Sequence, residues 1–243
     1  MATLVYDSWL AEVVGFDCYK TESCNADPRS VMREITRRPA FLYAKVPLTE
    51  VATIKALTNA GYYFVDTNVT LQHVASADGG CVNEAVVVEP AAAADHAAAQ
   101  DIAGNSFTYS RFHLDPNFPG ALADRVKREW VRSYCVGRRG EQLVVARLGG
   151  RVAGFLAVLA AEVEGRSAAI IDLIAVDRSA RKAGVGAALV HYFVTCWGER
   201  VQALRVGTQL ANLPSLALYR RCGFAIIEAR QVLHAHLRDG GVL

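Results

Sequence analysis

Three apolar segments that follow one another between residues 142 and 176 constrain the fold of this chain more than any other feature. QLVVARL and RVAGFLAVLAAEV alternate with the period of a strand, and only Gly149-Gly150, a pair typical of hairpin turns, separates them. GRSAAIIDLIAV follows an EGR turn as a third strand. Hairpins place neighbouring strands antiparallel, so this region predicts an antiparallel part of a sheet.

Helical and strand-like segments alternate on both sides of these strands. Before them lie the short strand NEAVVVEP, the alanine-rich helix AAAADHAAAQDIAG and the amphipathic helix ALADRVKREWVRSYC. After them lie the helix GAALVHYFVTCWGE, the strand ALRVGTQ, the helix LPSLALYRRCG and the terminal strand FAIIEARQVLHAH. The order β-α-α-β-β-β-α-β-α-β predicts a mixed sheet in an α/β domain.

A change of composition near residue 75 predicts a domain boundary. HVASADGGCVNE is rich in glycine and small polar residues, as linkers are. Before it, we expect the strand AFLYAKVPL and a helix that ends at Gly61, followed by a strand whose residues Tyr63, Val65, Thr67 and Val69 share one face. We therefore divide the chain into a small α/β domain (1–75), a linker (76–84) and a second domain (85–243).

The overall composition excludes several classes of protein. A net charge of +2 argues against nucleic-acid binding through overall charge. We expect no membrane span, because no apolar run reaches about 18 residues, and no signal peptide, because the first basic residue is Lys20. The six cysteines form no CxxC pair, so we expect reduced thiols, no metal site and a cytoplasmic location.

The segment RKAGVGAAL, residues 181–189, lies between the predicted strand IIDLIAV and a predicted helix. The first backbone N–H groups of a helix lack internal partners and carry partial positive charge, and glycines allow an anion to approach them. This favours a phosphate or pyrophosphate site. A glycine-loosened turn with a solvated basic pair is the alternative. The segment is neither a Walker loop nor a dinucleotide fingerprint, because both patterns are incomplete.

With this segment, the chain resembles the GNAT (GCN5-related N-acetyltransferase) superfamily. The resemblance covers roughly residues 82–237. The pyrophosphate loop of that family, [RQ]-x-x-G-x-[GA], is matched by Arg181, Gly184 and Gly186. A second motif, N-x-x-[AS]-x-x-L-Y-x-x-x-G-F, is matched by Asn212, Ser215, Leu218, Tyr219, Gly223 and Phe224. The resemblance implies an α/β GNAT fold with a mixed, mostly antiparallel central sheet flanked by helices, preceded here by the small N-terminal domain.

The resemblance also implies acetyl-CoA or a longer acyl-CoA as co-substrate, without a metal. The residues that it assigns to CoA binding are Ile174, Ala175, Val176, Arg181, Lys182, Ala183, Gly184, Val185, Gly186, Ala187, Asn212 and Ser215. A backbone N–H in the strand segment 174–176 is expected to hold the thioester carbonyl. For Asn212, binding of the pantetheine amides competes with a plain role as helix N-cap before Pro214.

By the same resemblance Tyr219 is the general acid that gives a proton to the departing thiolate; a packed helix tyrosine is the alternative. Asp172 is the candidate base, and a buried, hydrogen-bonded aspartate without a catalytic part is the alternative. Water is sufficient as proton acceptor if the acceptor amine has a pKa near 8, as expected for a sugar amine. We expect His113, His191, His234 and His236 to be solvated or structural rather than catalytic.

Stretches of the N-terminal half resemble a narrower group, the N-acyltransferases of TDP-fucosamine and related TDP-amino-sugars. They are YDSWLAEVVGFDCYK, LTNAGYYFVDTNVTL and SRFHLDPNFP, although Tyr6 stands where that group has Trp. The resemblance implies acceptor binding by Ser110, Arg111, Phe112 and His113, with Arg111 suited to a diphosphate. Phe112 as a core residue and Arg111 as a surface ion pair remain the alternatives.

The leading hypothesis is therefore an acyl-CoA-dependent N-acyltransferase that acts on a nucleotide-linked, dTDP-type amino sugar, as in O-antigen or lipopolysaccharide biosynthesis. N-acetylation of a peptide N-terminus, a polyamine or an aminoglycoside is the second enzymatic hypothesis. A non-catalytic acyl-CoA-binding regulator is the third. A homodimer is compatible with the long terminal strand.

Overall fold

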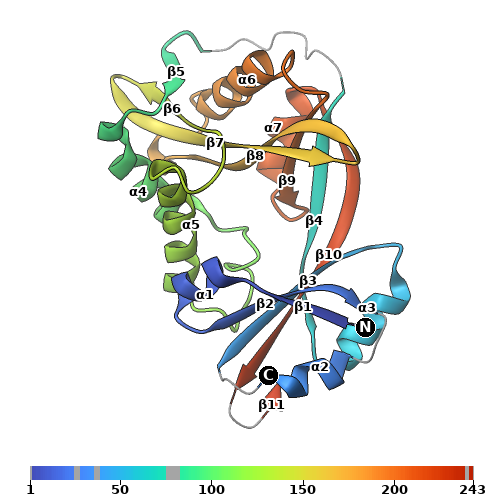
Figure 1. The fold of residues 1–243 in the computed structure, drawn as a ribbon. Helices are drawn as coiled ribbons and strands as arrows, with labels where there is room; N and C mark the ends of the chain where they lie inside the picture. Colours follow the sequence, from blue (N-terminus) through green and yellow to red (C-terminus); the bar gives the residue numbers. More distant parts are fainter. Residues whose placement is uncertain (1, 25–27, 36–38, 75–82, 239–240, 243) are drawn as a thin grey trace.

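Strand β10 (Phe224–Arg238) lies between strands from the N-terminal part of the chain in the computed structural model, which describes residues 2–24, 28–35, 39–74, 83–238 and 241–242. One edge of β10 pairs antiparallel with β3 (Ala40–Pro47) and the other with β4 (Tyr63–His73). One sheet therefore runs through the molecule in the order β1-β2-β3-β10-β4-β9-β8-β7-β6-β5, and the short β11 (Gly241–Val242) also pairs with β10 (Figure 1).

The C-terminal part has the predicted order of elements. Its strands are β5 (Val86–Pro90), β6 (Gln142–Leu148), β7 (Arg151–Val163), β8 (Arg166–Val176) and β9 (Ala203–Gln209). Its helices are α4 (His96–Ser106), α5 (Gly120–Cys135), α6 (Val185–Trp197) and α7 (Leu213–Arg221), with short 3-10 turns at Ala93–Asp95 and Arg178–Ala180. Every strand pair here is antiparallel except β8 with β9. The expected mixed, mostly antiparallel sheet is confirmed.

The N-terminal part consists of β1 (Ala2–Tyr6), α1 (Ser8–Val14), β2 (Asp17–Cys24), α2 (Pro28–Glu34), β3, α3 (Val51–Asn59) and β4. Most of the predicted linker, residues 76–82, lies outside the described residues. Because β4 is inserted between β9 and β10, the two predicted domains share one sheet. The division of the chain into two domains stays a prediction.

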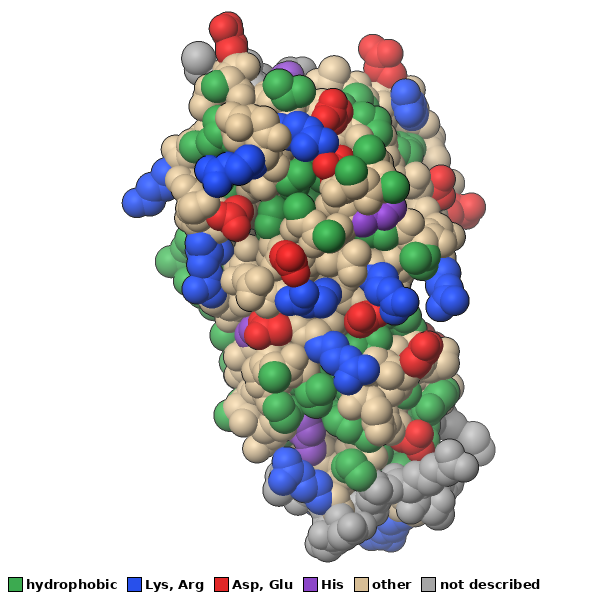
Figure 2. Space-filling view, turned by 90° about the vertical axis from the view of Figure 1, so that its left-hand side faces the viewer, with side chains coloured by type: hydrophobic (Ala, Val, Ile, Leu, Met, Phe, Trp, Pro, Cys, Tyr) green, Lys and Arg blue, Asp and Glu red, His purple; other side chains and the backbone are tan. Residues whose placement is uncertain are grey.

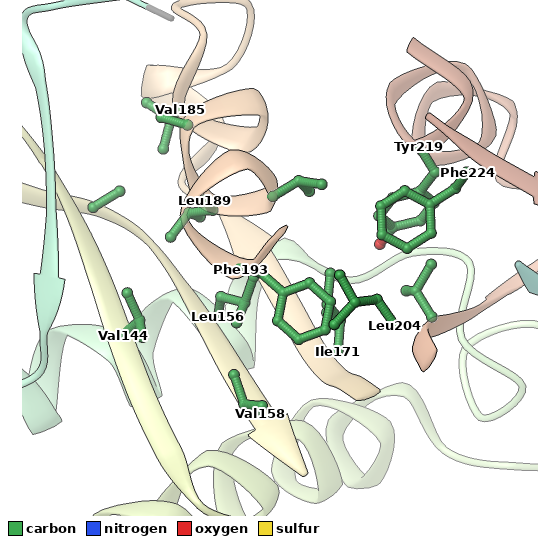
Figure 3. Packing of buried hydrophobic residues seen from close by; sticks show 14 of the residues in the cluster. Val144, Leu156, Val158, Ile171, Val185, Leu189, Phe193, Leu204, Tyr219 and Phe224 are labelled. Atoms are coloured by element: carbon green, nitrogen blue, oxygen red, sulfur yellow. The ribbon is translucent and has the colours of Figure 1, made fainter. Parts of the chain in front are cut away.

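Helices cover both faces of the sheet and create distinct cores. One core packs α6 and α7 against β4 and β6–β9 (Figure 3), and a second packs α4 and the end of α5 against the opposite face of β6–β8. In the N-terminal part, α2 and α3 cover one face of β3 and β10. The other face meets α1 and the first half of α5. Helix α5 thus joins the two parts of the molecule, and its Trp130 contacts both cores on its side.

The expected alternation along β4 is wrong at its first residue. Asp66 pairs with Val232 of β10 and Phe64 with Leu233, which leaves Val65 as an extra, bulged residue. A bulge reverses the side-chain alternation beyond it. Tyr63 therefore lies on the face of Asp66 rather than on the face of Thr67 and Val69, and Asp66 is buried there.

Gly154 of β7 allows α6 to pack closely on the sheet. A Cβ atom at this position would lie 2.9 Å from the carbonyl oxygen of Ala175 and 3.0 Å from Cγ1 of Val185, the first residue of α6. Such contacts are shorter than packed atoms tolerate, so any side chain here displaces α6 or β8.

We expect Gly154→Ala to lower the free energy of unfolding by about 1–3 kcal/mol, because the methyl group overpacks the α6 contact. Gly120→Ala is the matched control, since nothing lies within 4 Å of its Cβ position at the start of α5. Urea unfolding of both variants measures the difference. Equal stability of the two would show that α6 does not pack on Gly154 in this way.

Candidate active site

Strands β8 and β9 separate at one end, and the candidate active site lies along this opening. Their parallel pairing joins Ala168–Ile171 to Ala203–Val206 and then stops. Beyond it β8 pairs only with β7, as far as Val176, while β9 continues along β4. The backbone of the predicted segment 174–176 therefore has a side without a ladder partner in the described part of the sheet. Backbone N–H and C=O groups of this kind can bind the amides and the carbonyl of an extended ligand.

A β-bulge at Asp172 lies where β8 leaves β9. Ala157 of β7 pairs with Leu173 and the next residue, Val158, pairs with Ile171, so Asp172 has no partner on β7. The bulge turns Asp172 and Leu173 to the same face of the sheet, the one that α4 and α5 cover.

The carboxylate of Asp172 accepts four hydrogen bonds. Trp130 Nε1 donates at 2.8 Å and the Tyr134 hydroxyl at 2.7 Å, and Arg139 donates through Nε at 2.7 Å and Nη2 at 3.1 Å. Burial alone would raise the pKa of Asp172, but the hydrogen bonds and charge of Arg139 outweigh it and hold that pKa below its usual value. A carboxylate with this set of donors is a weak proton acceptor. Of the two roles expected for Asp172, this arrangement favours the structural one.

The glycine segment leads directly into α6. Lys182 and Gly184 both have positive φ angles, of 66° and 81°, and the helix starts at Val185. The N–H of Ala188 donates to the carbonyl of Gly184 in the first hydrogen bond of the helix. The N–H groups of the helical residues before Ala188 therefore have no partner within the helix. A Cβ on Gly186 would lie 3.2 Å from Leu218 Cδ2, which brings the first turn of α6 against α7.

The two basic residues of the segment behave differently. Arg181 Nη2 donates to the carbonyl of Ser106 at 2.9 Å, and so ties the segment to the last residue of α4. Lys182 is exposed beside it. The second anchor of the segment comes from the end of the predicted linker, where Asn83 Nδ2 donates to the carbonyl of Ala183 at 3.0 Å.

The second predicted motif lies on α7. Asn212 is the N-cap of this helix, and its side-chain oxygen accepts from the N–H of Ser215 at 3.3 Å. Tyr219 is buried beside Phe224, with ring centroids 6.0 Å apart, at the α7 side of the core in Figure 3. Burial raises the pKa of Tyr219, so the phenol keeps its proton at neutral pH. Ile174 and Val176 pack against the same core, which brings the end of β8 and Tyr219 to one region.

The predicted acceptor loop places Arg111 and Phe112 in different environments. Phe112 is buried among Phe41 and Phe118, as the core alternative proposed. Arg111 forms no ion pair with any described carboxylate. Its guanidinium lies 3.8 Å from the ring centroid of Tyr43, and burial lowers the pKa of Arg111. The surface ion pair expected as an alternative for Arg111 is therefore wrong.

Ser110 and His113 hold the loop on α5. His113 Nε2 lies 3.0 Å from the carboxylate of Asp124, and His113 Nδ1 lies 2.6 Å from the Ser110 hydroxyl. Because a carboxylate only accepts, Nε2 carries the proton of this contact. The chain of contacts is internal to the loop and α5, so it fixes the conformation in which Arg111 is presented.

Asp115, which no sequence motif singled out, is the centre of a buried polar cluster. Its carboxylate accepts from His234 Nδ1 at 2.7 Å, His236 Nε2 at 2.9 Å, the Tyr63 hydroxyl at 2.5 Å and the N–H of Asn117 at 2.8 Å. Burial would raise the pKa of Asp115, but these bonds, above all those from the two histidines, hold it far below its usual value. This arrangement fits the structural role expected for both histidines. Their spacing of two residues, which places them on one face of a strand, was the signal in the sequence for a shared partner.

Arg111 is linked to this cluster through His234. Arg111 Nη1 donates to His234 Nε2 at 3.2 Å, while His234 Nδ1 donates to Asp115. Burial and the positive charge of Arg111 lower the pKa of His234 to about 4. The imidazole is therefore neutral at pH 7, which leaves Nε2 free to accept from the guanidinium.

No helix in the described part of the chain is long and apolar enough to cross a membrane. Likewise, the described residues include no group of three or more His, Cys, Asp or Glu side chains arranged to hold a metal ion. The nitrogens of His234 and His236 that face Asp115 are used as donors to its carboxylate.

We expect Asp172→Asn to lower the free energy of unfolding by about 2–4 kcal/mol, because Arg139 loses its buried charge partner. The pH profile of any acyl transfer should keep its shape. Asp101→Asn is the control, since Asp101 pairs with Arg128 in an exposed ion pair worth at most about 1 kcal/mol. Unchanged stability together with loss of the acidic limb of the rate profile would make Asp172 the base after all.

We also expect a pH dependence of stability from His234. Its pKa is about 4 in the folded protein and near 6.5 when unfolded, so its contribution is complete above pH 6.5 and is lost as the pH falls towards 4. The slope from this group reaches about 1.4 kcal/mol per pH unit. Urea unfolding between pH 7.5 and 5 tests this. His234→Gln should have a lower free energy of unfolding than the wild type at pH 7.5. The slope of its free energy of unfolding against pH should be smaller than that of the wild type by this amount. His191→Gln, at an exposed site on α6, should remain parallel to the wild type; three parallel curves would contradict the assignment.

The sequence of this chain is similar to a known protein family and to a curated protein. Residues 108–224 match a family model described as the Acetyltransferase (GNAT) family. The spore coat polysaccharide biosynthesis protein SpsD of Bacillus subtilis (strain 168) is 29% identical over 135 residues, which are 55% of this chain and 45% of that protein. The match thus spans less than half of this curated relative.

Solved structures share the fold at low sequence identity. A GCN5-related N-acetyltransferase from Kribbella flavida gives a TM-score of 0.61 at 16% identity, with 98% of this chain and 88% of that chain covered. One from Sphaerobacter thermophilus gives 0.56 at 14% identity, with 83% and 61% covered. Residues 108–224 are thus similar in sequence to the GNAT acetyltransferase family, and the chain shares the fold of these solved GNAT structures.

Proposed function

We propose that this protein is an acyl-CoA-dependent N-acyltransferase whose acceptor is the amine of a nucleotide-linked amino sugar, of the dTDP-amino-dideoxysugar class. The similarity of residues 108–224 to the GNAT acetyltransferase family supports acyl-CoA as the donor. The polysaccharide biosynthesis named for SpsD, together with the resemblance of the SRFHLDPNFP loop, supports a sugar acceptor.

The observation that carries the proposal is the opening between β8 and β9, with Tyr219 and the first turn of α6 grouped around the same core. In the proposed site the first N–H groups of α6, with Lys182 beside them, hold the pyrophosphate of CoA. Backbone groups of 174–176 hold the pantetheine arm and polarise the thioester carbonyl. Asn212 caps α7 and so fixes the direction in which that helix presents Tyr219.

The reaction then proceeds by direct attack. The nitrogen of the acceptor amine forms a bond to the carbonyl carbon, and the C–S bond breaks as the tetrahedral intermediate collapses. Tyr219 donates its proton to the departing thiolate, which leaves as free CoA. Water takes the proton from the nitrogen, because Asp172 is engaged by four hydrogen bonds. The phenolate of Tyr219 recovers a proton from solvent and the amide product leaves.

Arg111 supports an anionic acceptor. Its positive charge is largely buried without a carboxylate partner among the described residues, and burial of an unpaired charge costs free energy. A phosphate group of a nucleotide sugar supplies the missing negative charge, and a peptide, polyamine or aminoglycoside amine does not.

Thiol release from acetyl-CoA tests the proposal against a panel of acceptors: dTDP-linked 3-amino and 4-amino dideoxysugars, a tetrapeptide, spermidine and an aminoglycoside. We expect turnover only with the nucleotide sugars. Tyr219→Phe should lower kcat by roughly 10²–10⁴-fold with little change in KM, because only proton donation is lost.

Tyr192→Phe is the control for this variant, because Tyr192 on α6 packs against the same core and its hydroxyl accepts a long hydrogen bond, of 3.4 Å, from Gln142. Turnover only with the peptide, spermidine or the antibiotic would overturn the acceptor assignment. Binding of acetyl-CoA without turnover of any acceptor or with any longer acyl donor would overturn the enzymatic proposal.

A further inference from the structure

Arg111 is not the only cation without a carboxylate partner in this region. Lys127 of α5 is only 7% exposed, and its Nζ contacts the aromatic rings of Phe107 and Trp130, each at 4.8 Å from the ring centroid. Lys45 of β3 is accessible to solvent, and no described carboxylate lies within ion-pair distance of it. In the surface view of Figure 2, Lys and Arg side chains are interspersed with Asp and Glu.

The register of the sheet brings Lys45 to the same face as Arg111. Tyr43 and Lys45 alternate on β3, where Tyr43 is paired with His234 and Lys45 with Val232. Residues two apart on a strand point to one face, so Lys45 follows Tyr43 along the face on which the guanidinium of Arg111 is stacked. The same face meets α1 and α5.

The three cations are close enough to repel one another. Burial, together with the positive charges of Arg111 and Lys45, lowers the pKa of Lys127 to about 7. Desolvation by the surrounding protein likewise lowers the pKa of Lys45 to about 8, with Arg111, Arg230 and Lys20 adding to the effect. Fixed positive charges in this proximity destabilise the protein unless something negative lies between them.

The neighbouring carboxylates do not neutralise the three cations. Asp172 is bonded in full by Arg139, Trp130 and Tyr134. Asp7 attracts Arg111, but its oxygens accept from Tyr43 and from the N–H of Leu10.

Asp66 adds a further polar group beside the cations. It lies in the row of Lys45 on the far side of β10, because both residues pair with Val232 of that strand. It is 4% exposed, and its Oδ2 has no hydrogen-bond partner in the described part of the chain. Burial raises the pKa of Asp66 to about 6, so near neutral pH it is partly protonated and then able to donate a hydrogen bond to an oxygen ligand.

We propose that Lys45, Arg111 and Lys127 form one binding subsite for the phosphate groups of a nucleoside diphosphate moiety, so that a strand of the N-terminal part completes the acceptor site of the acetyltransferase domain. This inference rests on the proposed function for the identity of the acceptor. It adds the ligand chemistry of Lys45 and Lys127, and it gives the N-terminal strands a part in binding.

Binding of dTDP and of inorganic pyrophosphate, measured by titration calorimetry without any acyl donor, tests the subsite. We expect Lys45→Met and Lys127→Met each to weaken dTDP binding at least 10-fold, because each removes a charge-assisted contact. Lys55→Met is the matched control, since the exposed Lys55 lies on α3, which covers the opposite face of β3. It should change the affinity less than 3-fold.

The pH dependence gives a second test. The charges facing Lys127 are Arg111, Lys45, Asp172 and Arg139, and those facing Lys45 are Arg111, Arg230, Lys20 and Asp172, with Asp66 in its row. A bound dianion favours the charged lysines, so the wild type should take up protons on binding at pH 7.5 and bind more weakly as the pH rises to 9. Lys127→Met should remove most of this uptake, which calorimetry in two buffers of different ionisation enthalpy measures.

Stability separates a binding role of Lys127 from a structural one. Without ligand, Lys127→Met should unfold at a temperature equal to or above that of the wild type, because a buried unpaired charge is replaced by an apolar chain of similar length. A lower unfolding temperature together with unchanged dTDP affinity would make Lys127 structural and overturn the proposal.

CoA is the other source of phosphate groups, and it serves as the competing ligand. The Lys45 and Lys127 variants should bind CoA as the wild type does, whereas Lys182→Met should weaken CoA and leave dTDP unchanged. Weakened CoA binding in the Lys45 variant would assign the three cations to CoA and overturn the proposal.

The proposed function and the subsite fail separately. Tight, lysine-dependent dTDP binding without acyl transfer to any dTDP-amino sugar would retain the subsite and remove the function. Acyl transfer to such sugars with wild-type dTDP affinity in both lysine variants would retain the function and remove the subsite.

Discussion

The two hydrogen-bonded ladders of β10 hold the molecule together. Along its 15 residues this strand pairs with β3 on one edge and with β4 on the other, and β4 in turn pairs with β9 of the C-terminal part. The position of the N-terminal strands relative to the β8–β9 opening is thereby fixed by backbone hydrogen bonds. Helix α5 reinforces this on one face, because its side chains pack in the cores of both parts.

Two groups of charged side chains lie within this frame and differ in how they are compensated. Asp115 is surrounded by donors from β4, β10 and its own loop, and Asp172 by donors from α5 and the residues after it, so each stabilises the local fold. The three cations have no carboxylate partner among the described residues. Arg111 and Lys127 lie against aromatic rings instead, and Lys45 has no ion-pair partner there. Charges that cost stability in the absence of a ligand are typical of binding sites, where the ligand completes the pairing.

The sequence was informative where the signal is local. Glycine pairs, strand alternation and helix periodicity predicted the order of elements from β5 to β10, and Asn212 before Pro214 predicted the cap of α7. It was not informative where the outcome depends on pairing between distant segments. The bulge at Val65 and the bonding of Asp172 by Arg139 follow from registers and contacts that no local pattern specifies. Likewise, Lys45 and Lys127 appear in sequence as ordinary surface lysines of a strand and an amphipathic helix, and only the packing of α5 near the β3 face brings them together.

The place of β10 in the sheet also has a consequence for how the chain acquires its structure. Tyr63 pairs with His234, 171 positions further along, so the centre of the sheet closes only after nearly the whole sequence is available. Pairing over such separations is slow, because the loop between the partners must be ordered first. Until then β3 and β4 remain unpaired edges on a growing chain, open to non-native strand pairing. The pairing that fixes the N-terminal strands against the β8–β9 opening therefore forms only after β10 has been synthesised.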